Sequence, residues 1–253
     1  MMTSIQENKL LKNAISRAFW LILWQLAALK VGKELILPSP FAVVKALGGL
    51  VVTASFWQNT FATILRVLSG YCLGIVSAVI LAVLTCSSDL ADSLLSPIIR
   101  IVRATPVASF IILALLWMGK SNVPVLMSML MVVPVVWENI VAQYHATDKN
   151  LLEMAEAYDL SNWKKFRFIY VPSAFPGFLA GCLSAMGLAW KSGIAAEVLS
   201  QPTLAIGSNL YYSKVYLETP ELFAWTAVVV ILSMCIEKLI KKWLFRGAGN
   251  ENK

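Results

Sequence analysis

The sequence predicts an all-α membrane protein with about six transmembrane helices, folded as one domain over residues 1–253. Apolar residues make up 58% of the chain and charged residues only 14%, with a mean hydropathy of +0.72. A soluble domain is near half apolar and a quarter charged, so the lipid bilayer is the natural environment for this chain. Long uncharged runs, such as the 22 residues of Val67–Ser88, can each cross ~30 Å of hydrocarbon as a helix. Basic residues gather between these runs, which favours membrane topology and not a nucleic-acid partner.

The uncharged runs define the expected spans. Ala104–Trp137 holds one charge, Lys120, and is too long for a single helix, so we divide it there. The first span has only the 12 uncharged residues of Ala18–Leu29 at its centre, so Arg17 and Lys30 must snorkel for it to cross. A helix lying in the membrane interface is the alternative for this segment. The expected spans are 14–32, 60–85, 96–118, 122–142, 172–194 and 221–241.

Basic residues also set the orientation. With the N-terminus inside, 14 of the 21 Lys and Arg residues fall in cytoplasmic segments. Cytoplasmic loops carry an excess of Lys and Arg, so we expect a multi-pass membrane protein with both termini in the cytoplasm. Segments 31–58 and 197–220 are then external.

The segment 144–171 is the one sizeable polar loop on the expected inner side. Asp148 can cap a first short helix, and Ser161 or Asn162 can cap a second. Asp159-Leu160 between them is a candidate turn. Two amphipathic helices at a membrane surface fit either a packed interfacial loop or a docking surface for a cytoplasmic partner.

This loop resembles the EAA motif of permease subunits of ATP-driven (ABC) importers, in which E-A-A is followed by three residues, G, nine residues and I-x-L-P. Here the register is Glu153-Met154-Ala155, then Asp159, then Ile169-Tyr170-Val171-Pro172, with every spacing kept. Met154, Asp159 and Val171 depart from the pattern. Asp159 replaces a glycine suited to a left-handed turn, and Asp is among the residues that tolerate one.

The resemblance covers about residues 35–243 and is closest to the nitrate/sulfonate/taurine permease group. It implies a type I ABC importer permease fold with a cytoplasmic coupling-helix loop, located in a bacterial-type inner (cell) membrane. It also implies two permease copies, as a homodimer or a heterodimer, two cytoplasmic ATPases that bind ATP and Mg, and an extracytoplasmic substrate-binding protein. The substrate would be a small organic or inorganic anion such as a sulfonate or nitrate. The residues implied for ATPase coupling are Glu153, Ala155, Asp159, Trp163, Phe166, Ile169 and Pro172.

No motif in the chain predicts catalysis. The P-loop pattern G-x-x-x-x-G-K-[ST] does not occur, so we expect no ATP hydrolysis by this chain and no cofactor of its own. One histidine, and four cysteines without a C-x-x-C pair, give no metal-site pattern. An ion-coupled carrier or a channel without an ATPase partner is the alternative function, and it would have no need of the EAA-type loop.

Four residues in or near the spans are candidates for the transport pathway or its gate: Glu138, Trp190, Lys191 and Glu197. Ionisable groups inside a membrane usually face protein or a watery cavity. Lys191 could attract an anion, and Trp190 could close a constriction by its bulk. Alternatively, Lys191 and Glu197 lie at the outer interface and Glu138 snorkels to the inner one.

Overall fold

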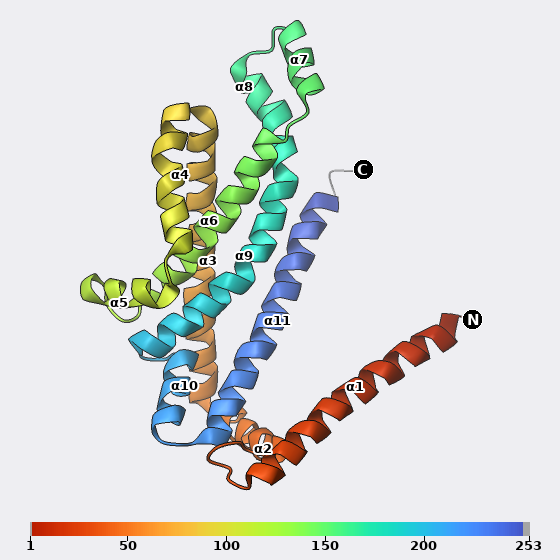
Figure 1. The fold of residues 1–253 in the computed structure, drawn as a ribbon, viewed down its shortest axis with the longest axis vertical. Helices are drawn as coiled ribbons and strands as arrows, with labels where there is room; N and C mark the ends of the chain where they lie inside the picture. Colours follow the sequence, from red (N-terminus) through yellow and green to blue (C-terminus); the bar gives the residue numbers. More distant parts are fainter. Residues whose placement is uncertain (1, 250–253) are drawn as a thin grey trace.

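A computed structural model describes residues 2–249, and within that range the chain is helical and holds no strand, which confirms the predicted fold class (Figure 1). Helices α1 to α6 are Met2–Val31, Pro40–Val51, Ala54–Ser87, Asp89–Ala104, Val107–Trp117 and Val123–His145. Helices α7 to α11 are Lys149–Ala157, Asn162–Lys165, Val171–Ser200, Ile206–Val215 and Thr219–Gly249, and the π-helix η1, Phe166–Tyr170, joins α8 to α9.

The core lies where α3, α6 and α9 pack against one another along the long axis (Figure 1). Glycines on α3 allow α6 to come close. A Cβ on Gly70 would stand 2.3 Å from the carbonyl oxygen of Val125, and one on Gly74 would stand 2.6 Å from Val132 Cβ. Only hydrogen fits between such backbones, so these glycines determine how closely the two helices approach.

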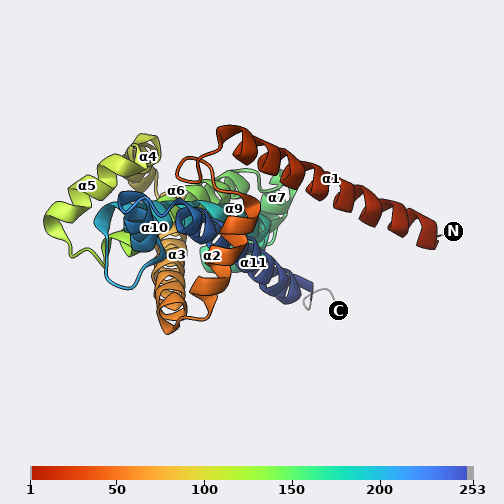
Figure 2. The ribbon, with the colours of Figure 1, turned by 90° about the horizontal axis from the view of Figure 1, so that it is seen from below.

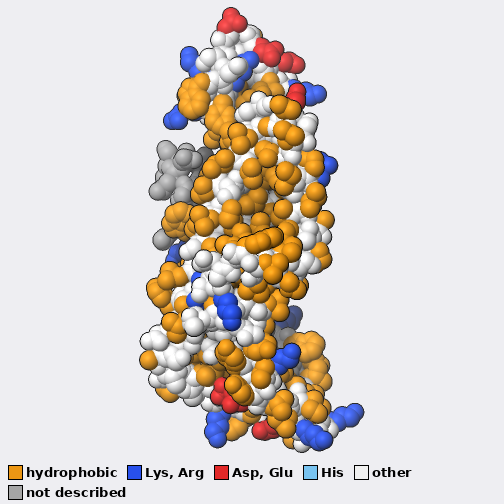
Figure 3. All heavy atoms as spheres, turned by 90° about the vertical axis from the view of Figure 1, so that its left-hand side faces the viewer, with side chains coloured by type: hydrophobic (Ala, Val, Ile, Leu, Met, Phe, Trp, Pro, Cys, Tyr) orange, Lys and Arg blue, Asp and Glu red, His pale blue; other side chains and the backbone are white. Residues whose placement is uncertain are grey.

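Four described helical segments are long and apolar enough to cross a membrane, and the bent pair α4–α5 makes a fifth candidate. The four are Ala54–Ser87, Val123–His145, Asn162–Ser200 and Thr219–Trp243. On the face shown in Figure 3, hydrophobic side chains cover the middle of the molecule and acidic side chains lie near its two ends. Helix α7 lies at one end, and α2 and α10 lie at the other, as the predicted topology requires (Figure 1).

The segment predicted as one span over 96–118 differs in the structure. Helix α4 already begins at Asp89, after the single residue Ser88, and the chain then turns by 105° between α4 and α5. The turn lies at Thr105-Pro106, where both residues are extended, with ψ of 133° and 132°. Proline lacks the N–H for a helical bond and pushes the residue before it out of the α region, so the helix ends there.

Helix α1 extends away from the bundle (Figures 1 and 2). Its anchor is Trp24, whose Nε1 donates to the carbonyl oxygen of Pro38 at 3.1 Å and whose ring stacks on Phe223. Neighbouring apolar side chains such as Trp20 and Leu29 are exposed by 64% and 66%. The apolar part of α1, Ala18–Val31, is shorter than the four candidate spans, so α1 is not among the helices long and apolar enough to cross a membrane.

Candidate functional site

Helix α7 forms the tip of one end of the molecule, the end predicted to be cytoplasmic, which we call the inner end (Figure 1). The helix begins at the predicted cap. The Asp148 carboxylate accepts a hydrogen bond from the Asn150 backbone N–H at 2.9 Å, which satisfies one of the free donors of the first turn. Ala155 is fully buried. Met154 and Tyr158 are exposed by 46% and 75%, so α7 presents apolar surface outward.

The turn after α7 has the geometry of a Schellman motif. Asp159 has φ of +48°, in the left-handed region. Its N–H donates to the carbonyl oxygen of Glu156 at 3.0 Å, and the Leu160 N–H donates to that of Ala155 at 2.9 Å. These two bonds close the end of a helix when a left-handed residue follows it. Asp159 therefore makes the turn for which the EAA pattern uses glycine.

The second helix of the loop continues into α9 without a break. Ser161 precedes α8 as expected but makes no side-chain capping bond. Trp163 is 67% exposed and stacks on Phe166, which is half-buried. Pro172 has no N–H to offer the carbonyl of the preceding turn, and the chain passes through the π-helix η1 just before it. Segment 162–200 is thus one long helix that joins the loop to the core.

The other predicted coupling residues lie on both sides of this helix junction. Glu153 is exposed on α7, Ile169 is buried at 6% exposure, and Pro172 is exposed at the start of α9. The structure therefore brings the seven residues into one loop and its junction with α9, and within them Ala155 and Ile169 are structural core.

Glu197 lies at the opposite end, which is predicted to be external and which we call the outer end, and it is fully buried at the C-terminal end of α9. Its carboxylate accepts hydrogen bonds from Thr63 Oγ1 at 2.9 Å, from Arg66 at 3.1 Å and from the Gly207 N–H at 3.1 Å. Arg66 also donates to the backbone carbonyls of Thr203 and Leu204, each at 2.9 Å. We call Thr63, Arg66, Glu197 and the 203–207 backbone the outer-end knot. It ties α3, α9 and α10 together within one subunit.

The outer-end knot changes the interpretation of Glu197. Its oxygens are occupied by donors from its own chain and have no exposed surface, so a structural role explains this residue better than a pathway role. Sequence reasoning missed Arg66 as its partner, because 131 residues separate the two.

Trp190 and Lys191 are neighbours in sequence but lie in different environments. Trp190 is 1% exposed, and its Nε1 donates to the carbonyl oxygen of Val229 on α11 at 3.1 Å, so its bulk fills the core. Lys191 is exposed on α9 and forms no ion pair with any described side chain. It lies on the exposed face of α9 formed by Ser184, Leu188, Lys191 and Ala195, which recur at helical spacing.

Glu138 on α6 pairs with Arg103 at the end of α4, and both side chains are more than half exposed. The pairing brings two opposite charges together, one on the largely apolar α6 and one on α4, which carries four charged residues. Glu138 thus contacts the α4–α5 bend directly, through a residue 35 positions away in the sequence.

Glu237 on α11 is a further acidic residue that the sequence reasoning passed over. Its Oε1 lies 3.2 Å from the position that a Cβ on Gly187 would occupy, near the middle of α9. Its only side-chain hydrogen bond within the described residues is a long one, 3.4 Å, from Ser233 Oγ. An Asp or Glu in an otherwise apolar helix was the available signal, since such groups are usually functional. The described residues contain no cluster of His, Cys, Asp and Glu that could hold a metal.

The chain resembles known transport proteins over most of its length. Residues 70–247 match the family model described as a binding-protein-dependent transport system inner membrane component. The Escherichia coli strain K12 protein SsuC, named as an aliphatic sulfonates transport permease, is 30% identical over 223 residues, which cover 85% of this chain and 81% of the relative. The taurine transport system permease protein TauC of the same organism is 23% identical over 220 residues, covering 85% and 80%.

Two solved structures share the fold. An amino acid ABC transporter superposes with a TM-score of 0.62 at 16% identity, covering 73% of this chain and 90% of the other. The methionine ABC transporter MetNI, in an inward-facing form, gives a TM-score of 0.55 at 15% identity, with 81% and 96% covered. At these identities the likeness concerns the fold alone.

Proposed function

Because this chain belongs to the family of binding-protein-dependent transport system inner membrane components, and so is the permease subunit of an ABC importer, we propose that it carries a small organic or inorganic anion, such as a sulfonate or nitrate. Its family implies ATPase partners and a substrate-binding protein. The permeases named for sulfonates and taurine support the substrate class.

The coupling step rests on the loop that contains α7. A capped helix with exposed Met154 and Tyr158 offers apolar contacts to a groove on a cytoplasmic ATPase. The continuous helix 162–200 then carries a movement of the loop into the core. Glu153 and Trp163 lie on the exposed surface of this loop and belong to the same docking surface. This arrangement is the observation that carries the proposal, since a channel or an ion-coupled carrier has no need of it.

The pathway follows the exposed face of α9 that contains Lys191, with Glu237 and the Arg103–Glu138 pair as further polar groups. A lysine without a carboxylate partner among the described side chains can attract an anion. One such helix face cannot enclose a solute, so two copies of the subunit face each other across the pathway. A two-fold homodimer is the usual closed arrangement of identical chains, and we expect it here. In this arrangement both termini of each copy lie in the cytoplasm.

Uptake into vesicles that contain the permease, its ATPase and its binding protein tests this function. ATP-dependent uptake of a sulfonate should occur, and Lys191→Met should impair it while the complex still assembles. Lys120→Met, in the exposed α5–α6 connection, is the matched control and should leave uptake unchanged. Equal uptake without ATP would favour the carrier or channel, and unchanged uptake in Lys191→Met would remove Lys191 from the pathway.

A further inference from the structure

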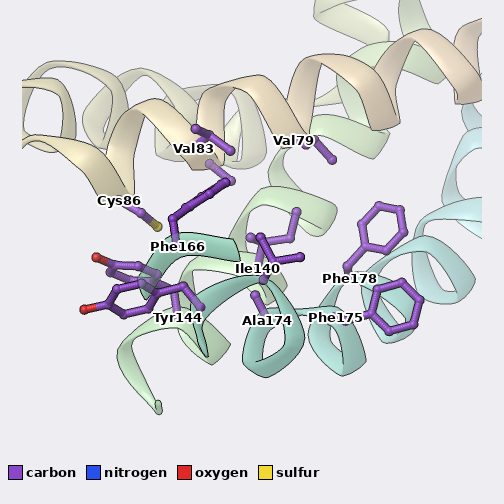
Figure 4. Close-up of a pocket in the computed structure, with 12 residues that line it drawn as sticks. Val79, Val83, Cys86, Ile140, Tyr144, Phe166, Ala174, Phe175 and Phe178 are labelled. Atoms are coloured by element: carbon purple, nitrogen blue, oxygen red, sulfur yellow. The ribbon is translucent and has the colours of Figure 1, made fainter. Parts of the chain in front are cut away.

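An apolar groove of about 220 Å³ lies next to the junction between the coupling loop and α9 (Figure 4). Its walls are the last two turns of α3, the end of α6, and the helix formed by η1 and α9. Val83, Ile140 and Phe178 are typical of the lining, which is apolar almost throughout. From Val79 to Cys86 the groove runs along roughly 10 Å of α3, at 1.5 Å per residue.

We propose that this groove binds an acyl chain of an anionic phospholipid from the leaflet on the coupling-loop side. The position of the groove along α3 suits this occupant. It begins at the end of α3 nearest the loop and extends about a third of the way through ~30 Å of hydrocarbon. At that depth the surrounding solvent is lipid, and an apolar wall selects an apolar chain.

Two tyrosines mark the end of the groove at which a headgroup would lie. Tyr144 and Tyr170 line the groove and stack with ring centroids 4.5 Å apart. The Tyr144 hydroxyl points toward the Cys86 end of the groove (Figure 4). Tyrosine prefers the level where headgroups meet hydrocarbon, because its ring is apolar and its hydroxyl is wet. The pair therefore identifies the membrane interface and supplies donors to a phosphate ester.

Beside this end, three basic residues favour an anionic headgroup, and Asp92 in the first turn of α4 is an opposing charge near Cys86. Lys164, Lys165 and Arg167 lie within one helical turn of Phe166, which lines the groove. None of the three forms an ion pair with a described side chain. The acidic residues of the loop, such as Glu153 and Asp159, lie before this helix begins, on α7 and its turn. Clustered Lys and Arg at the end of a membrane helix attract anionic lipids.

Binding here would act on the coupling joint itself. Phe166 and Tyr170 belong to the π-helix η1, the only irregular part of the helix that connects the loop to the core in the described structure. Single π-turns occur often at functional sites. A lipid packed against η1 would contact that joint directly, so the composition of the membrane would modulate transport.

Native mass spectrometry of the purified full chain in detergent, with phosphatidylglycerol or phosphatidylcholine added, tests the proposal without any transport step. Wild-type protein should retain phosphatidylglycerol over phosphatidylcholine by at least about tenfold, and Lys164→Gln with Arg167→Gln should remove most of that preference. The control, Lys238→Gln with Lys242→Gln, removes the same charge from exposed positions on α11 and should change nothing.

A second pair of variants tests the groove. Ala174→Leu places a larger side chain in the lining and should reduce retention of both lipids, whereas Ala180→Leu, exposed on α9 outside the groove, should not. Gel filtration verifies folding, and the charge variants alter only exposed side chains.

Equal retention of both lipids by wild type, or unchanged retention in both test variants, would overturn the proposal. Loss of the dimer in Ala174→Leu without a lipid effect would also overturn it and assign the groove to a second copy. Since binding is measured without ATP or substrate, failure here leaves the transport function intact, and the reverse also holds.

Discussion

The two ends of this subunit differ in whether their functional side chains are buried within the chain or exposed on its surface. At the outer end, Glu197 has no exposed surface, and its carboxylate accepts bonds from Thr63, Arg66 and Gly207 of its own chain. At the inner end, Tyr158 and Trp163 leave 75% and 67% of their surfaces uncovered. One end satisfies its polar groups internally, and the other keeps apolar surface for contact with another molecule.

This difference indicates where the subunit is rigid and where it depends on a partner. The Arg66–Glu197 ion pair, whose buried carboxylate accepts three hydrogen bonds, holds α3, α9 and α10 as a unit. The continuous helix 162–200 joins that unit to the loop. A displacement of α7 by a partner can therefore be transmitted along this helix to the core. Changes at the outer end should therefore cost stability, and changes at the inner end should cost coupling.

The largest loss of stability is expected from Glu197→Ala. It leaves Thr63 and the Gly207 N–H without this acceptor and Arg66 without its counter-charge. Removing one partner of a buried pair costs about 3–5 kcal/mol. Thermal unfolding in detergent measures the loss. Glu218→Ala, with an exposed side chain on the loop before α11, is the control and should unfold like wild type. A Glu197→Ala protein as stable as wild type would mean that the outer-end knot holds nothing together.

A smaller loss should follow Gly70→Ala. The new Cβ would lie 2.3 Å from the Val125 carbonyl oxygen, so α3 and α6 must separate, at a cost of about 1–3 kcal/mol. Gly48→Ala on α2 meets nothing within 4 Å and should gain up to about 1 kcal/mol, because alanine has the higher helix propensity. Urea titration of both variants measures the change in the free energy of unfolding, which should be a loss for Gly70→Ala and a gain for Gly48→Ala. A similar effect from both would show that helix approach does not depend on Gly70.

Sequence reasoning succeeded where the determinants are local. Asp148 as a cap and Asp159 as a left-handed turn depend on bonds to residues two to five positions away, and the structure confirms both. The Arg66–Glu197 pair was out of reach, because no local pattern indicates which of many distant charges will meet. The break within 96–118 could have been predicted, because Thr105-Pro106 is a helix-ending signal. The prediction gave more weight to the long uncharged run that contains this signal.

Asp159 is expected to show a still smaller and more local effect. Asp159→Val places a β-branched side chain at φ +48° and should destabilise the turn by about 1–2 kcal/mol, whereas Asp159→Gly should stabilise it. Hydrogen exchange of the Leu160 amide, which donates to Ala155, measures the turn directly. Faster exchange in Asp159→Gly than in Asp159→Val would contradict the left-handed assignment.

Trp163→Ala should change stability least, by less than about 0.5 kcal/mol, because the side chain is 67% exposed. Its effect should appear in function, as weaker stimulation of ATP hydrolysis by substrate-loaded binding protein. Leu90→Ala, 70% exposed at the α3–α4 turn, removes a comparable apolar group elsewhere at the same end and should leave that stimulation unchanged. If both variants behave alike, Trp163 has no special place in docking.

Crosslinking of the loop to the ATPase tests the central claim most directly. Tyr158→Cys and, at the opposite end, Glu218→Cys are made in a background in which all four native cysteines are replaced by alanine. With a short bifunctional reagent and the purified ATPase carrying a surface cysteine beside its groove, Tyr158→Cys should yield a crosslinked pair and Glu218→Cys should not. Contradiction would come from labelling of position 158 by an impermeant reagent outside intact cells, or from a crosslink at position 218 in place of 158.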